Sequence, residues 1–291
     1  MFRGSIVALI TPFRNGAVDE NALQNIVDWH VAEGTHGLVP VGTTGESPTL
    51  THDEHKHVVD LVVEASGGRL PVIAGAGSNS TAEAIEFTAH AKEAGADAAL
   101  IVTPYYNKPS QAGLFAHYEA IVDSVDIPVI IYNIPGRCII DMSVETMAKL
   151  AELPNIIGVK DSTGDMARPL LTTASCGKDF CQFTGEDATA VAFLAHGGHG
   201  AISVTANVAP RLCSKMHEAW QRGDAKEALA IQERLMPLHT ALFVETSPAP
   251  VKYALTRLGK ADAEIRLPLV DCSEATKKVV DQAMTSAGLI N

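Results

Sequence analysis

The sequence has no long apolar run. No segment approaches the roughly 18 consecutive apolar residues that a membrane-spanning helix requires. The apolar stretch at residues 6–10 is also too short for the core of a signal peptide, and it ends at Thr11 and Pro12. We therefore expect a soluble, cytoplasmic protein.

Paired cysteines and an excess of positive charge are also missing. The chain has 5 cysteines, an odd number, and their spacings match no common metal-binding pattern. With 34 acidic and 22 basic residues, the net charge is −12, which repels nucleic-acid phosphates. No basic amphipathic stretch suggests a membrane surface. We expect reduced thiols, and neither nucleic acid nor membrane as a partner.

The chain does contain short apolar runs rich in Val and Ile, separated by amphipathic stretches. Continuous apolarity without alternation is typical of parallel strands buried on both faces. The eight predicted strands are residues 6–10, 37–41, 72–74, 98–102, 129–132, 156–160, 179–184 and 200–204. Their alternation with helices over 291 residues predicts an α/β fold, a (β/α)8 TIM barrel. A doubly wound open sheet is the alternative, but the glycine-rich dinucleotide turn is missing after the first strand.

Local signals mark several helix ends. Thr51 with Glu54, and Ser80 with Glu83, have the spacing of a capping box, and Gly34 is placed to end a helix. From residue 224 onward only helices are predicted, at 224–242, 247–258 and 273–287. We therefore divide the chain into a catalytic barrel, residues 1–223, and a C-terminal helical region, residues 224–291.

Two polar residues end predicted strands, where barrel enzymes place their chemistry. Lys160 follows four apolar or small residues, and apolar surroundings favour the neutral amine that attacks carbonyl groups. Lys160 could equally pair with Asp161 at a strand end. Tyr132 could move protons as an acid or base, or could be a core residue with a satisfied hydroxyl.

Two loops carry further candidates. The sequence GTTGES at residues 42–47 offers hydroxyl and backbone N–H groups to a carboxylate, although such composition is also that of ordinary turns. Arg137 lies in a Pro-Gly turn and is suited to bidentate capture of a carboxylate, or is a solvated cation. The 11 histidines show no zinc spacing, so we expect no metal.

Together these segments resemble the pyruvate-dependent class I aldolases related to N-acetylneuraminate lyase. The resemblance rests on GTTGE at residues 42–46, YNIP at 132–135 and GVKD at 158–161, in that order, and covers nearly the whole chain. Arg137, together with YYNKP at 105–109, is similar to the members that condense pyruvate with L-aspartate 4-semialdehyde in lysine (diaminopimelate) biosynthesis. Segment 247–252 begins with Ser where Asn is commoner, a difference we expect to affect packing or assembly before catalysis.

The resemblance implies a role for each matching residue. Lys160 forms the Schiff base with pyruvate, so no other cofactor is needed, and Tyr132 is the main acid and base. Thr43 and Thr44 hold the pyruvate carboxylate, and Thr43 links a proton relay with Tyr132 that Tyr106 from a neighbouring subunit completes. Arg137 binds the carboxylate of the second substrate. Gly185 and Ile202 match positions that line the pyruvate pocket.

The resemblance also implies regulation and assembly. A feedback site for lysine at a dimer interface is matched by Ser47, His52, His55, Asn79, Glu83 and Tyr105. Some of these residues are also ordinary helix-start residues. A homotetramer, built as a dimer of dimers, is expected from the resemblance alone. The alternatives are cleavage of sialic acid or a sugar acid on the same scaffold, and a metabolite-binding paralogue without activity.

Overall fold

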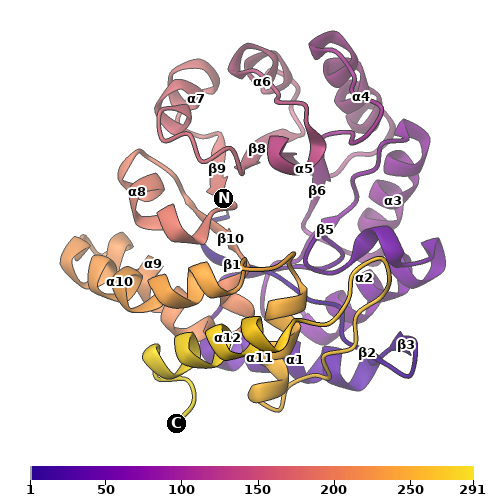
Figure 1. The fold of residues 1–291 in the computed structure, drawn as a ribbon. Helices are drawn as coiled ribbons and strands as arrows, with labels where there is room; N and C mark the ends of the chain where they lie inside the picture. Colours follow the sequence, from indigo (N-terminus) through magenta and orange to yellow (C-terminus); the bar gives the residue numbers. More distant parts are fainter. Residues whose placement is uncertain (1) are drawn as a thin grey trace.

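Eight parallel strands form the centre of the molecule in a computed structural model that describes residues 2–291 (Figure 1). The strands are β1 (Gly4–Ala8), β4 (Gly37–Val39), β5 (Ile73–Gly75), β6 (Ala98–Val102), β7 (Val129–Asn133), β8 (Ile156–Asp161), β9 (Cys181–Thr184) and β10 (Gly200–Ser203). Each one overlaps a strand predicted from the apolar runs. The eight predicted strands are therefore confirmed.

The sheet closes on itself. Its strand order is β4-β1-β10-β9-β8-β7-β6-β5, with all neighbours parallel. A parallel bridge between Leu38 and Val72 joins the two ends, and the Gly75 N–H donates to the Pro40 carbonyl at 3.0 Å. Closure removes the free sheet edges, and the expected TIM barrel is confirmed.

Helices surround the strands as an outer layer (Figure 1). They are α1 (Glu20–Glu33), α2 (His52–Ser66), α3 (Thr81–Ala94), α4 (Gln111–Ser124), α6 (Val144–Leu150), α7 (Arg168–Cys176), α8 (Ala190–Ala195) and α9 (Pro210–Gln221). Short helical turns lie in the loops between them: η1 (Ser47–Thr49), α5 (Pro135–Cys138), η2 (Asp187–Thr189) and η3 (Thr205–Asn207).

The helix ends follow their local signals. Thr51 and Glu54 form the complete capping box at the start of α2. At α3 only half of the predicted box forms: the Ser80 side chain accepts from the Glu83 N–H, whereas the Glu83 carboxylate accepts from the Ser78 hydroxyl and not from the Ser80 N–H. Gly34 ends α1 in the left-handed conformation, where glycine has no steric penalty.

Two apolar layers stabilise the barrel. Inside it, buried side chains such as Ile6, Ile130, Phe183 and Ile202 fill the space between the strands. A larger core lies between the strands and the outer helices, and includes Leu23, Val59 and Ile131. The filled interior leaves the carboxyl ends of the strands as the place for a site.

One element was missed. β2 (Phe13–Arg14) and β3 (Ala17–Val18) form an antiparallel hairpin after β1. Asn15 and Gly16 both have positive φ, at 55° and 83°, as a two-residue hairpin turn requires. The Asn-Gly pair is a strong local hairpin signal, so this element was readable from the sequence.

Three helices complete the chain: α10 (Ala225–Ala241), α11 (Ala249–Arg257) and α12 (Glu274–Ser286). They agree with the predicted helices to within two residues. α10 packs against α9 and α12, and α11 contacts α12 and η3 (Figure 1). Among residues 2–291, the structure has no helix both long enough and apolar enough to span a bilayer.

Candidate active site

Lys160 and Tyr132 meet at the carboxyl ends of two neighbouring strands. They are register partners in β8 and β7. Both are 6% exposed, and Lys160 Nζ lies 4.2 Å from the centre of the Tyr132 ring. The two strand ends therefore hold an amine and a phenol in contact in a nearly dry environment.

Two adjoining cavities open beside this pair. The larger, of about 260 Å³, is lined by Thr43, Tyr132 and Arg137, among others. The smaller, of about 50 Å³, shares these three residues and adds Lys160 and Thr44. The structure thus brings together five of the predicted site residues around one continuous hollow.

The loop with Thr43 and Thr44 is tightly packed. A Cβ at Gly45 would lie 3.0 Å from the Val41 backbone nitrogen and 3.1 Å from the Leu9 carbonyl, so the turn requires glycine there. The Thr11 hydroxyl donates to the Gly45 carbonyl at 2.7 Å. The backbone of this loop is therefore fixed against the end of β1.

The same loop is held from the C-terminal region. Glu46 has a positive φ of 56°, and its carboxylate forms an ion pair with Lys252 of α11. Both side chains are buried, and burial lowers the pKa of Lys252, with Glu46 acting in the opposite direction. The Arg266 N–H donates to Glu46 Oε2 at 3.0 Å, and Lys252 Nζ donates to the Glu264 carbonyl at 2.8 Å. We call Glu46, Lys252, Glu264 and Arg266 the Glu46 network.

Arg137 lies at the mouth of the site. It belongs to the short helix α5, in the loop that follows β7, and its side chain is exposed while lining both cavities. An exposed guanidinium there can reach a ligand that enters from solvent, and it offers two parallel N–H donors to a carboxylate.

Of two further predicted residues, Gly185 lines the smaller cavity and Ile202 lines neither cavity. A Cβ at Gly185 would overlap the Ser162 hydroxyl and lie 3.0 Å from Lys160 Cε, so a side chain here would have to displace Ser162 and crowd the amine. Ile202 is fully buried in the apolar layer inside the barrel, in the cluster that includes Tyr132.

Tyr106 is placed differently from the other predicted residues. Its side chain is 89% exposed, it has a positive φ of 70°, and it lines neither of the two cavities. Within the part of the chain that the structure describes, the site is formed without it. This placement suits a residue presented outward.

Several residues of the small cavity were not among the predicted site residues, and four of them are Ser162, Glu186, Phe243 and Ser247. Ser162 and Glu186 lie just beyond the ends of β8 and β9, so the strand-end argument that predicted Lys160 applies to them as well. Burial, with a smaller contribution from Asp187, raises the pKa of Glu186. Phe243 and Ser247 come from the segment between α10 and α11, which no local pattern connects to the site. Segment 247–252, expected to affect packing first, therefore also reaches the cavity.

A second polar group lies near the outer edge of the larger cavity. Ser47 and Tyr105 line that cavity, and the Asn79 amide donates to the Tyr105 carbonyl at 3.2 Å. His52 Nε2 lies 2.8 Å from Glu83 Oε1. His55 is buried and stacked on the Phe87 ring, and burial lowers its pKa to about 4. The six residues expected to form a lysine site thus lie on η1, α2, α3 and the adjoining loops.

Comparison with known proteins places the chain in a family. The model of the dihydrodipicolinate synthetase family matches residues 1–287. The 4-hydroxy-tetrahydrodipicolinate synthase of Rhodospirillum centenum is 66% identical over 290 residues, covering 100% of both chains.

Two solved structures are similar throughout. The chloride-inhibited dihydrodipicolinate synthase of Acinetobacter baumannii, complexed with pyruvate, is 44% identical, with a TM-score of 0.97 and 100% coverage of both chains. The Cyanidioschyzon merolae enzyme with lysine bound is 40% identical, with a TM-score of 0.96 and 99% coverage of both chains. This chain belongs to the dihydrodipicolinate synthetase family.

Proposed function

We propose that the protein condenses pyruvate with L-aspartate 4-semialdehyde to 4-hydroxy-tetrahydrodipicolinate, in lysine (diaminopimelate) biosynthesis. The observation that carries this proposal is the buried Lys160 amine, 4.2 Å from the Tyr132 ring centre and inside a cavity that Arg137 also lines. The 66% identity to a synthase of that name and the likeness to a pyruvate complex support it.

The first half of the reaction joins pyruvate to Lys160. The neutral amine adds to C2 of pyruvate, and the resulting carbinolamine loses its oxygen as water to give an iminium. Tyr132, in contact with the amine, donates the proton that this oxygen needs. Thr43 and Thr44 bind the carboxylate with hydroxyl and backbone donors. The iminium itself is the electron sink, so the proposed chemistry uses no other cofactor.

The second half joins the two substrates. Loss of a proton from C3 gives an enamine, whose C3 attacks the aldehyde carbon, and the aldehyde oxygen takes up a proton to become the product hydroxyl. Arg137 holds the carboxylate of the semialdehyde at the mouth. The amino group of this substrate then adds to the iminium carbon, expels the Lys160 amine and closes the ring. Gly185 leaves space beside the amine for these steps.

The exposed Tyr106 supports an assembly. We propose that Tyr106 enters the site of a second copy and completes the relay through Thr43 and Tyr132, within a homotetramer built as a dimer of dimers. Its 89% exposure and outward placement on the loop after β6 support this role. A phenylalanine at this position would lower kcat without preventing assembly.

The second polar group supports feedback inhibition. We propose that lysine binds where Ser47, His52, His55, Asn79, Glu83 and Tyr105 gather, with the Glu83 carboxylate and Asn79 amide taking the ammonium and amino groups. The lysine complex of the related C. merolae enzyme supports this site.

The five free cysteines suit a reducing compartment, and we propose that the protein is located in the cytoplasm.

A direct turnover assay tests the proposal. The purified chain should convert pyruvate plus L-aspartate 4-semialdehyde, and should not cleave sialic acid at a comparable rate. Lys160→Ala should reduce turnover to background. Preferential cleavage of sialic acid or a sugar acid would assign the alternative reaction on this scaffold. Binding of pyruvate without any turnover would assign a metabolite-binding role instead.

A further inference from the structure

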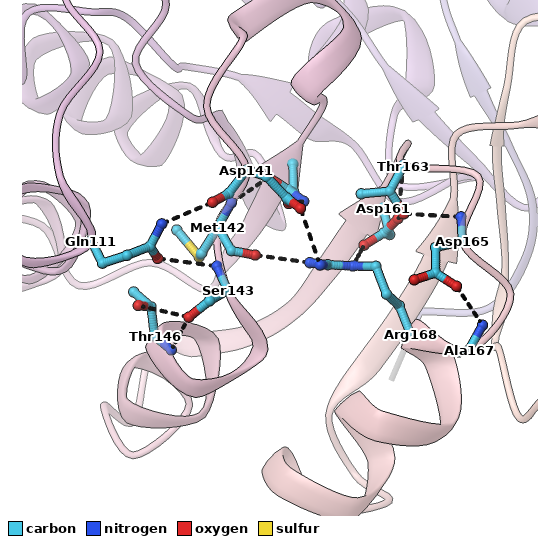
Figure 2. A network of polar contacts seen from close by, with 11 residues as sticks. Gln111, Asp141, Met142, Ser143, Thr146, Asp161, Thr163, Asp165, Ala167 and Arg168 are labelled. Atoms are coloured by element: carbon cyan, nitrogen blue, oxygen red, sulfur yellow. Dashed lines mark hydrogen bonds and ion pairs between the residues drawn. The ribbon is translucent and has the colours of Figure 1, made fainter.

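Arg168 is a buried arginine behind the wall formed by β7 and β8. It is the first residue of α7, only 8% exposed, and it lines neither cavity (Figure 2). Its Nε donates to Asp161 Oδ2 at 2.8 Å, and its Nη2 donates to the Met142 carbonyl at 2.9 Å. Its Nη1 lies 3.5 Å from Asp141 Oδ2. One guanidinium therefore connects the end of β8 to residues 141 and 142, behind the site.

The first connection fixes the strand end that carries Lys160. Asp161 follows Lys160 in β8, and successive side chains of a strand point to opposite faces. While Asp161 Oδ2 accepts from Arg168, its Oδ1 accepts from the Thr163 N–H at 2.9 Å and the Thr163 hydroxyl at 2.6 Å (Figure 2). Both carboxylate oxygens are thus occupied, and the backbone next to the reactive amine has little freedom.

The second connection fixes the loop that carries Arg137. This loop leaves β7 at Asn133, the register partner of Asp161, and returns at Asp141. The Asn133 amide donates to Asp141 Oδ1 at 2.7 Å, and the Met142 N–H donates to Asn133 Oδ1 at 3.0 Å. Arg168 contacts Asp141 and Met142, the two residues at the returning end of the loop. We call Arg168, Asp161, Asp141, Met142 and Asn133 the Arg168 network.

We propose that Arg168 is a positioning residue that holds the Schiff-base lysine and the carboxylate-binding arginine in one fixed geometry. The inference rests on the proposed function. Arg168 contacts no cavity, so its effect passes through Asp161 to Lys160 and through Asp141 and Met142 to the Arg137 loop. Displacement of reacting groups by about 1 Å can cost up to about 100-fold in rate, so a contact behind the wall can control catalysis.

Stability alone does not test this role. Replacing a buried ion pair by apolar groups is often neutral or stabilising, whereas removing one partner is costly. Two kinetic readouts isolate positioning. The rate at which borohydride traps pyruvate on Lys160 reports the β8 end. The KM for L-aspartate 4-semialdehyde reports the Arg137 loop.

The experiment compares Arg168→Met with the unchanged full-length chain. We expect about tenfold slower trapping and a KM for the semialdehyde raised about tenfold, because both connections are lost together. Arg168→Lys, which retains the charge but not the fork of N–H donors, should recover part of both effects. Arg222→Met is the matched control, because Arg222 is exposed and, among residues 2–291, forms an ion pair with Glu227 alone, at 2.9 Å.

Two variants separate the connections and serve if Arg168→Met does not fold. Asp141→Ala should raise the semialdehyde KM while leaving the trapping rate unchanged, and half of the Asp141 side chain is exposed, so the variant should fold. Thr163→Val should slow trapping while leaving that KM unchanged. If both variants moved both readouts equally, or moved neither, the two-branch arrangement would be wrong.

The same measurements distinguish failure of the positioning role from failure of the proposed function. If the unchanged chain neither traps pyruvate nor turns over, the proposed function fails first. If it does both, and folded Arg168→Met matches it in trapping rate and in KM, Arg168 has only a structural role and the inference is overturned.

Discussion

The two walls of the site are held by contacts of different range. On the wall that carries Lys160 and Arg137, the Arg168 network joins residues that all lie between positions 133 and 168. On the wall that carries Thr43 and Thr44, the Glu46 network joins the loop to residues as far as 220 positions away. One wall is completed within a few consecutive elements, and the other only when the C-terminal region docks.

The difference separates the two substrates. By the proposed mechanism, the Glu46 network supports the pyruvate carboxylate site, and the Arg168 network supports the amine and the semialdehyde site. We propose that residues 224–291, although they carry none of the predicted catalytic residues, are required for pyruvate binding because Lys252 and Arg266 hold the Glu46 loop. Variants in each network test whether the two networks support different substrates.

The largest loss of stability is expected for Lys252→Met. It leaves the Glu46 carboxylate buried without its cation, a change that costs about 3–5 kcal/mol. Urea unfolding measures the loss, and the KM for pyruvate should rise more than that for the semialdehyde. The double variant Glu46→Gln with Lys252→Met removes both charges and should recover most of the stability. Equal stability of the single variant and the native chain would contradict the role of this pair.

A smaller loss is expected for Asn133→Ala in the other wall. The change removes the donor to Asp141 and leaves the buried Met142 N–H without its acceptor, at a cost of about 2 kcal/mol. Here the KM for the semialdehyde should rise more than that for pyruvate. Asn155→Ala is the control, because Asn155 donates to Asp126 at the surface. A larger increase in the KM for pyruvate than in the KM for the semialdehyde would contradict the assignment of this wall to the semialdehyde.

Acid should weaken the contact between Glu54 and Arg266, which lies beside the rest of the Glu46 network. The hydrogen bonds from Arg266 lower the pKa of Glu54 to about 2. A carboxyl with a lowered pKa stabilises the fold above its unfolded value near 4.5, and this stabilisation is lost as pH falls toward 2. We expect the free energy of unfolding to fall by about 1–2 kcal/mol through this group. Glu54→Gln retains the cap geometry and should remove most of this pH-dependent decrease. The measurement is the urea unfolding midpoint of the native chain and of Glu54→Gln at several pH values between 5 and 2. The midpoint of the variant should fall less steeply as pH decreases.

The smallest effect is expected at Arg222, outside both walls. Its ion pair with Glu227 is exposed, and such pairs contribute about 0.5 kcal/mol or less. Arg222→Met should leave the unfolding midpoint and both KM values nearly unchanged. A large change in any of the three would show that substitutions perturb this barrel generally, and would remove the basis for comparing the walls.

Much of this site could be predicted from the positions of polar residues at the ends of the predicted strands. Parallel barrel strands present their carboxyl ends at one rim, so Lys160, Tyr132 and Thr43 could be expected together once eight strands were recognised. The same argument applies to Ser162 and Glu186, which were not predicted although they lie one and two residues beyond the ends of β8 and β9.

The Glu46 network could not be predicted in this way. A lysine in a helix ordinarily indicates a solvated face, yet Lys252 is fully buried and pairs with a carboxylate more than 200 positions earlier. Its partner is set by how α11 packs on the barrel, and no local pattern encodes that. Phe243 and Ser247 reach the cavity for the same reason.

In the proposed reaction, the amine of Lys160 becomes covalently bonded to pyruvate. The most direct measurement is mass spectrometry of the digested chain after incubation with pyruvate and borohydride. We expect one reduced pyruvate on the peptide containing Lys160, and none on any peptide of Lys160→Ala. An unmodified Lys160 peptide, or addition at another lysine, would contradict it.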